Sequence, residues 1–104
     1  MKKASPLTPR DSPTLTNYAN RYVFAIGGQN LKNFETDSST EFYSCKDNKW
    51  RRAPALNQPR IFHSTCALGD MLYTFAGRVD KKKYHDTMER LNAKECVNRR
   101  ESAW

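Results

Sequence analysis

The chain has 104 residues, of which 38% are hydrophobic, and its formal net charge is +7 at pH 7. This length allows one small domain of marginal stability, and the positive charge bears on solubility and weak attraction to acidic partners rather than on fold. No apolar run approaches the roughly 20 residues that span a bilayer. No apolar stretch follows the N-terminal lysines, so we expect no secretory signal and a cytoplasmic or nuclear protein.

Residues 1–20 are rich in Ser, Thr and Pro and have no regular apolar spacing. Such a segment buries too little surface to offset the entropy that it loses on ordering. We therefore predict a disordered tail, in which the Ser-Pro and Thr-Pro pairs are candidates for proline-directed phosphorylation.

Three short strands are predicted next, at residues 22–27, 39–45 and 50–53. The first is apolar and runs into a glycine pair, the second is rich in Thr, Phe and Tyr, and the third ends at a proline. β-Branched and aromatic residues favour strands, and glycine or proline ends them. The polar residues between these segments are typical of loops and turns.

Three further strands are predicted at residues 61–68, 71–76 and 87–91. Gly69 and Asp70 separate the first two, and this dipeptide is typical of a two-residue hairpin turn. A basic loop precedes the last strand. Short strands at intervals of about 8–12 residues indicate an all-β fold.

The two halves of the chain resemble each other. YVFAIGG at residues 22–28 is similar to LYTFAGR at residues 72–78, which gives a spacing of 49 residues when the final glycines are aligned. Repeats of this length indicate an architecture of stacked units. The aligned positions are Gly28 and Gly77, Glu41 and Glu89, and Trp50 and Trp104.

An apolar strand that ends in a glycine pair, followed by a Glu-x-Tyr strand and a tryptophan, resembles the Kelch repeat. In the first copy the motif residues are Gly27, Gly28, Glu41, Tyr43 and Trp50. The second copy keeps Gly77, Glu89 and Trp104, but Ala76 replaces the first glycine and Leu91 the tyrosine. We expect the motif residues to be scaffold, because both faces of a propeller blade are buried.

The resemblance implies an all-β fold, a partial β-propeller of roughly two antiparallel Kelch-type blades behind the disordered tail. The expected first repeat covers residues 21–60 and lacks its first strand. The expected second repeat covers residues 61–104, is degenerate and is truncated at its fourth strand. A propeller needs typically 4–8 blades to close, so this chain requires further Kelch blades or self-association.

The resemblance also implies a non-enzymatic module that binds another protein, such as the substrate-recognition arm of a ubiquitin-ligase adaptor or a cytoskeletal linker. Partners of such propellers dock on the loops that connect strands and blades. Carried to this chain by loop position, the expected binding residues are Gln29, Arg60, Phe62 and Arg78. No catalytic residue is expected.

Two alternatives remain open at this point. The basic loop at residues 78–85 is a candidate contact for nucleic acid, and the chain could instead be a non-functional propeller fragment. No metal or cofactor is expected, because His63 and Cys66 point to opposite faces of a strand. The three cysteines form no CxxC pair, and we expect free thiols.

Overall fold

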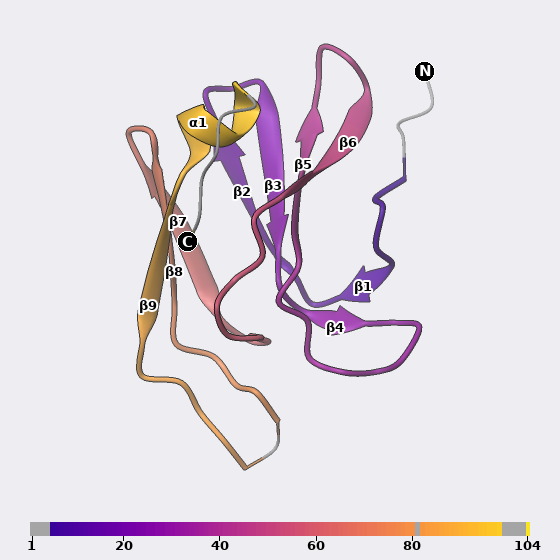
Figure 1. The fold of residues 1–104 in the computed structure, drawn as a ribbon, viewed down its shortest axis with the longest axis vertical. Coiled ribbons are helices and arrows are strands. Elements are labelled where there is room, and N and C mark those ends of the chain that lie inside the picture. Colours follow the sequence, from indigo (N-terminus) through magenta and orange to yellow (C-terminus); the bar gives the residue numbers. More distant parts are fainter. Residues whose placement is uncertain (1–4, 81, 99–103) are drawn as a thin grey trace.

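The computed structural model describes residues 5–80, 82–98 and 104, and these form antiparallel sheets with one short helix (Figure 1). The elements are β1 (Arg10–Asp11), β2 (Thr14–Tyr18), β3 (Tyr22–Ile26), β4 (Gln29–Asn30), β5 (Thr40–Ser44), β6 (Lys49–Ala53), β7 (Ser64–Leu68), β8 (Met71–Phe75), β9 (Met88–Asn92) and α1 (Ala93–Val97). Each strand predicted from the sequence overlaps one of these strands, which confirms the all-β prediction.

Two sheets make up most of the fold. We call the four-stranded sheet β2-β3-β5-β6 blade 1 and the three-stranded sheet β7-β8-β9 blade 2. Strand β2 of the first lies against strand β7 of the second, so the two blades stack side by side. This arrangement is a partial propeller that its described residues do not close, as the sequence predicts. Strands β1 and β4 form a small separate ladder.

The prediction of a disordered tail is wrong for the part of it that the structure describes beyond residue 9. Residues 14–18 form β2, which pairs with β3 along its whole length, from Thr14 opposite Ile26 to Tyr18 opposite Tyr22. The first repeat therefore does not lack its first strand. The local sequence of this segment has only a weak preference for a strand. The segment is ordered because it pairs with β3 and lies against the neighbouring β7. Residues 1–4 lie outside the described part.

The core lies between the two blades. Blade 1 contributes Phe24, Ile26 and Phe42, and blade 2 contributes Leu72 and Leu91, all 3% exposed or less. The rings of Phe24 and Phe42 stack with their centroids 5.3 Å apart. Because burial of apolar surface is the main favourable contribution to folding, we expect this shared interface to stabilise both blades.

The chain after β9 differs from the expectation of a truncated fourth strand. Helix α1 begins at once, capped by the Asn92 side chain, which accepts a hydrogen bond from the backbone N–H of Glu95 at 3.0 Å. Its buried Ala93 and Cys96 extend the core. Residues 99–103, where such a strand would continue, are not described. Among the described residues, no helix has the length and apolar composition that crossing a bilayer requires.

Trp104 does not take the place that Trp50 has in blade 1. Trp50 belongs to β6 and pairs with Tyr43 of β5, whereas no described strand pairs with the outer side of β9. The indole Nε1 of Trp104 instead donates to the carbonyl oxygen of Pro54 at 2.7 Å. It thereby covers the connection between the blades.

Candidate functional site

A buried arginine from the segment that precedes each blade ties the loops of that blade together. In blade 2, Arg60 forms an ion pair with Glu89, with Nε 3.2 Å from Oε2, and Nη1 donates to the carbonyl oxygens of Ala76 and Thr87 at 2.8 and 3.1 Å. Glu89 also accepts hydrogen bonds from the backbone N–H groups of Asn57 and Gln58. One guanidinium therefore holds three chain segments at the loop end of the blade.

Blade 1 repeats this arrangement with Arg10 and Glu41, whose Nη2 and Oε2 atoms lie 2.8 Å apart. Nη1 of Arg10 donates to the carbonyl oxygens of Gly27 and Ser39, and Glu41 accepts from the backbone of Leu7 and Thr8. Arg10 is not among the residues predicted from the sequence. The signal that could have found it is the dipeptide Pro-Arg, which occurs at residues 9–10 and again 50 positions later at residues 59–60.

The prediction that Arg60 contacts a partner is wrong. Its side chain is 0% exposed, and every contact described above is with this chain. Loop position alone could not reveal this, because the residue that buries the charge, Glu89, lies 29 positions further along the chain. Arg60 positions the loops that carry the other predicted residues.

Gly27 and Gly77 lie in turns that closely approach the connection between the blades, and this approach requires glycine. A Cβ on Gly27 would lie 2.7 Å from the carbonyl oxygen of Arg60, and one on Gly77 would lie 2.8 Å from that of Ile61. Both residues also have a positive φ, at 67° and 88°, a conformation that glycine adopts without strain. The turns at Gly27 and Gly77 therefore lie in direct contact with residues 60–63.

His63 connects the blades at the same place. Its Nε2 donates to the carbonyl oxygen of Ile26 at 2.7 Å and lies 3.0 Å from Oγ1 of Thr14, both in blade 1. Burial lowers the pKa of this imidazole, and the charge of Arg60 lowers it further against the opposing effect of the Ile26 hydrogen bond. Nδ1 is buried without a partner among the described residues, so protonation would place an unpaired charge in the interface.

Stability should therefore fall as the pH falls below the ordinary histidine pKa of 6.5. In that range the unfolded chain binds a proton at His63 that the folded chain does not, so the free energy of unfolding decreases by at most about 1.4 kcal/mol per pH unit. At pH values above 6.5, His63 does not make the free energy of unfolding depend on pH. Urea denaturation between pH 7.5 and 5.5 measures this, and His63→Gln should flatten the curve. A slope that survives in His63→Gln but disappears in His85→Gln contradicts the assignment.

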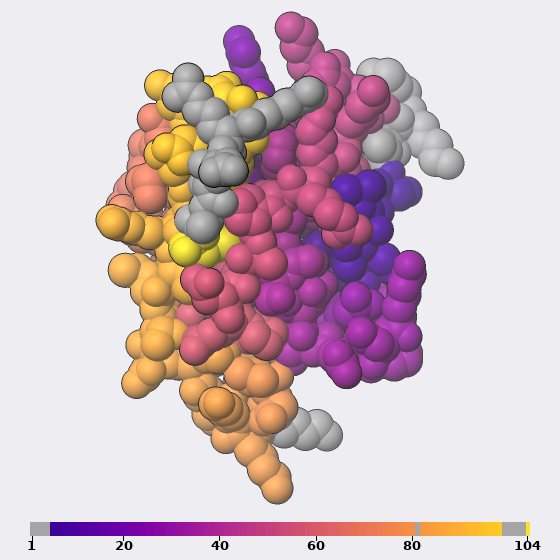
Figure 2. Space-filling view, in the orientation of Figure 1, coloured from indigo at the N-terminus to yellow at the C-terminus, as the bar shows by residue number. Residues whose placement is uncertain are grey.

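Three of the four predicted binding residues meet around one hollow between the loops. Gln29, Phe62 and Arg78 come from three separate connections and line a cavity of about 540 Å³, which we call the interblade hollow. The remaining lining residues are Phe34, Glu35, Thr36, Pro59, Ile61, Val79 and Asp80. The contributing loops lie at one end of the molecule, opposite α1, and the loop after β8 projects from that end (Figures 1 and 2).

Backbone contacts fix the loop that carries Arg78. Arg78 and Ile61 exchange backbone hydrogen bonds of 2.9 and 2.8 Å, and the N–H of His85 donates to the carbonyl oxygen of Gly77. The hydroxyl of Thr36 donates to the carbonyl oxygen of Val79 across the hollow. The walls are therefore held in place before any partner binds.

The surface of the hollow combines a cation with exposed aromatic rings. The Arg78 guanidinium lies 4.6 Å from the ring centroid of Tyr84 and 6.0 Å from that of Phe62. Phe62 and Phe34 are 66% and 70% exposed. Both have a left-handed backbone, with φ of 56° and 60°, which costs a bulky residue free energy and is concentrated at functional sites.

No carboxylate of the described residues neutralises Arg78. The ion pairs found among those residues join Arg10 to Glu41, Arg51 to Asp47 and Arg60 to Glu89. Asp80 accepts hydrogen bonds from the backbone of Lys82 and Lys83, which hold its pKa below the ordinary value. The hollow therefore offers a guanidinium that lies against aromatic rings and has no ion-pair partner among the described residues. The described residues contain no group of three or more His, Cys, Asp or Glu placed to hold a metal ion.

Two stacked antiparallel sheets, with glycine turns and a repeated Arg–Glu pair at the same end of each, define the class: these are neighbouring blades of a β-propeller. The chain is 33% identical over 89 residues to Kelch-like protein 22 of Xenopus tropicalis and 31% identical over 83 residues to its human counterpart. It is also 38% identical over 56 residues to an F-box/kelch-repeat protein of Arabidopsis thaliana. The chain belongs to the Kelch-repeat family.

These matches cover much of this chain but little of the relatives. They include 81%, 79% and 53% of the chain, in the order given, but only 13%, 12% and 15% of the three relatives. No protein-family model matches the chain. The likeness therefore concerns the blades and not the whole architecture of those proteins.

Proposed function

We propose that the chain is a non-enzymatic protein-interaction module that binds its partner at the interblade hollow. The observation that carries this proposal is the convergence of Gln29, Phe62 and Arg78 from three loops. Loops held on a rigid scaffold are where proteins most often place binding residues. Membership of the Kelch-repeat family supports an interaction role.

The chemistry of the hollow favours a partner segment with an acidic residue next to an apolar one. Arg78 has no carboxylate partner among the described residues, and its planar fork pairs with a carboxylate through two hydrogen bonds. Phe34, Phe62 and Tyr84 offer exposed rings to the neighbouring apolar side chain. Aromatic residues and arginine dominate binding hot spots. Glu35 on the wall repels a second acidic group, so we expect one acidic residue at this position rather than an acidic run.

Within this class, we propose substrate recognition for a ubiquitin-ligase adaptor as the first role and a link to the cytoskeleton as the second. The name of the Arabidopsis relative combines an F-box with kelch repeats, which favours the first role. Either role needs a partner protein, and neither needs catalysis.

A random 12-residue peptide library displayed on phage tests the hollow. We expect the selected peptides to share an Asp or Glu beside an apolar residue. Fluorescence polarisation measures the affinity of a selected peptide. This affinity should be at least about tenfold weaker for Arg78→Ala and for Phe62→Ala, as expected for hot-spot residues. Arg51→Ala, which removes an exposed arginine from blade 1, is the matched control and should bind normally.

Several results would contradict the proposal: no selected peptide, peptides without an acidic residue, or binding that Arg78→Ala and Phe62→Ala leave unchanged. Binding of a single-stranded oligonucleotide tests the nucleic-acid alternative. Binding that falls steeply with salt and is lost in Lys82→Ala/Lys83→Ala, with no peptide binding, would replace a protein partner by nucleic acid. Lys81 lies outside the described residues.

A further inference from the structure

The segment around β1 contains three positions at which a hydroxyl residue precedes proline. They are Ser5-Pro6, Thr8-Pro9 and Ser12-Pro13. A phosphate on such a hydroxyl adds a charge of about −1.5 to −2 and three strong acceptor oxygens. The charges around each hydroxyl therefore decide whether a phosphate can be bound by the folded chain.

Ser12 is poorly placed to carry a phosphate. It lies between β1 and β2 with a left-handed backbone, at a φ of 54°. Its hydroxyl donates to a carboxylate oxygen of Asp11 at 3.4 Å. A phosphate beside an acidic side chain is repelled by it, so the folded chain does not favour this position.

Thr8 has basic neighbours instead. Its hydroxyl accepts a hydrogen bond from Nη1 of Arg52 at 3.4 Å. Thr8, Arg52 and Lys32 are among the residues that line a cavity of about 290 Å³, which we call the polar hollow. Arg52 and Lys32 are exposed, and no carboxylate of the described residues forms an ion pair with either of them. Two cations therefore stand beside the hydroxyl with room for an anion.

The carboxylates near the polar hollow already have donors of their own. Asp37, which also lines it, accepts hydrogen bonds from the backbone N–H and the hydroxyl of Ser39 at 2.9 and 2.8 Å. Glu41 pairs with Arg10 and accepts from the backbone N–H of Thr8. The two cations of the polar hollow are therefore left to bind a further anion.

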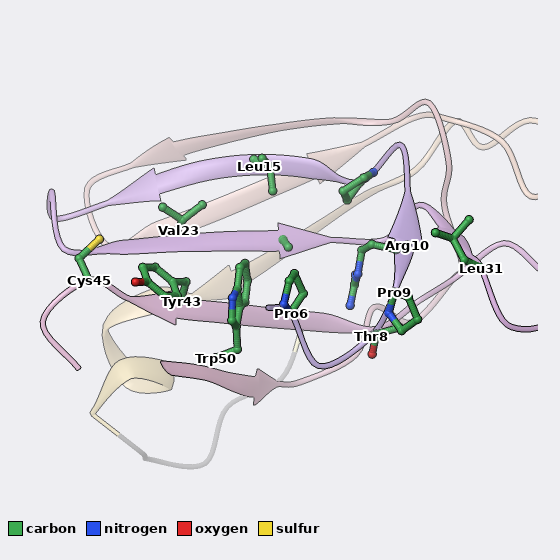
Figure 3. A pocket seen from close by; sticks show the side chains of 12 residues that line it. Pro6, Thr8, Pro9, Arg10, Leu15, Val23, Leu31, Tyr43, Cys45 and Trp50 are labelled. Atoms are coloured by element: carbon green, nitrogen blue, oxygen red, sulfur yellow. The ribbon is translucent and has the colours of Figure 1, made fainter. Parts of the chain in front are cut away.

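The attachment of Thr8 to blade 1 determines when its hydroxyl can react. Figure 3 shows Pro6, Thr8 and Pro9 along the sheet of blade 1, before β1 begins at Arg10. Thr8 is only 9% exposed, so a kinase can reach it only while these residues are lifted off the blade. Residues 5–9 belong to no described strand, and segments outside the core elements open at a lower free energy than the core itself.

We propose that Thr8 is a phosphorylation site and that its phosphate binds Arg52 and Lys32 in the polar hollow. A proline-directed kinase transfers the γ-phosphoryl group of ATP to Oγ1 of Thr8. The Oγ1–P bond forms, the bond between the γ-phosphorus and the bridging oxygen breaks, ADP leaves, and the hydroxyl proton passes to the base of the kinase. The phosphate then joins residues 5–9 to the loop after β4 and to β6, and so fastens this segment to blade 1.

A chain synthesised with phosphothreonine in place of Thr8 tests where the phosphate lies. Phosphorus NMR follows the titration of the phosphate in native buffer and in urea. Because nearby cations favour the doubly ionised phosphate, its titration midpoint should lie at a lower pH in the native chain than in urea. Arg52→Ala and Lys32→Ala should each move the midpoint back toward its value in urea. Arg51→Ala, which removes the neighbouring arginine of β6 that pairs with Asp47, is the matched control and should leave it unchanged.

Treatment of the unaltered chain with a proline-directed kinase and Mg-ATP tests the site itself. Mass spectrometry should locate phosphate on Thr8, and Pro9→Ala should abolish this modification. That variant keeps the carbonyl oxygen at residue 9 that accepts from the backbone N–H of Leu31, and circular dichroism checks that every variant is folded. The proposal is overturned by a chain that takes up no phosphate at Thr8, by a midpoint no lower in native buffer than in urea, or by a shift that both Arg52→Ala and Lys32→Ala leave intact.

Discussion

Replacement of Arg60 by methionine is expected to lower the free energy of unfolding by about 3–5 kcal/mol, because removal of one partner of a buried ion pair leaves the other charge uncompensated. The side chains of Arg60 and Glu89 are 0% and 8% exposed. The substitution also leaves the carbonyl oxygens of Ala76 and Thr87 without their donor. The free energy of unfolding of a whole domain is only about 5–15 kcal/mol, so the variant should be largely unfolded.

The exposed pair of Arg51 and Asp47, whose side chains are 30% and 48% exposed, provides the matched control. Arg51→Met should cost about 0–1 kcal/mol. Urea denaturation at one protein concentration compares the two variants. In the double variant Arg60→Met/Glu89→Gln no charge is left unpaired, and part of the lost stability should return. Equal costs for Arg60→Met and Arg51→Met would contradict a structural role for the buried pair.

The second large effect is expected for Phe24→Ala, which should cost about 3–5 kcal/mol. Phe24 is 0% exposed, stacks on Phe42 at 5.3 Å and contacts the edge of Tyr18 at 6.5 Å. Its removal leaves a cavity at the centre of the interface between the blades. Because this is the shared core, both blades should lose order together.

Thermal unfolding followed by circular dichroism measures this loss, and Phe34→Ala is the matched control. Phe34 is 70% exposed, so the same truncation there should change stability by no more than about 0.5 kcal/mol. A cooperative transition in the unaltered chain that Phe24→Ala abolishes would also argue against a non-functional fragment. An unchanged midpoint in Phe24→Ala would show that the blades do not depend on this interface.

The residues that line the interblade hollow were only partly predictable from the sequence. Gln29, Phe62 and Arg78 follow predicted strands or the predicted connection between blades, so loop position brings them to one end of the molecule. Arg60 lies in the same connection, but its side chain turns inward to Glu89. A loop arginine is exposed unless a carboxylate elsewhere in the chain buries it, and only the fold determines whether that carboxylate is in reach.

The sequence by itself determined the strands that have a strong local signal and the repeat that relates them. β3, β5 and β8 are apolar or aromatic segments that end at glycine or at a turn, and local preference suffices to place them. The tertiary structure alone decided the order of β2, the burial of Arg10 and Arg60, and the site of Trp104. The partner strand of β2 lies 4 to 12 residues further along the chain, and the partners of Arg60, Arg10 and Trp104 lie 29, 31 and 50 residues away. These placements therefore depend on how the chain folds back on itself and not on the preference of each segment alone.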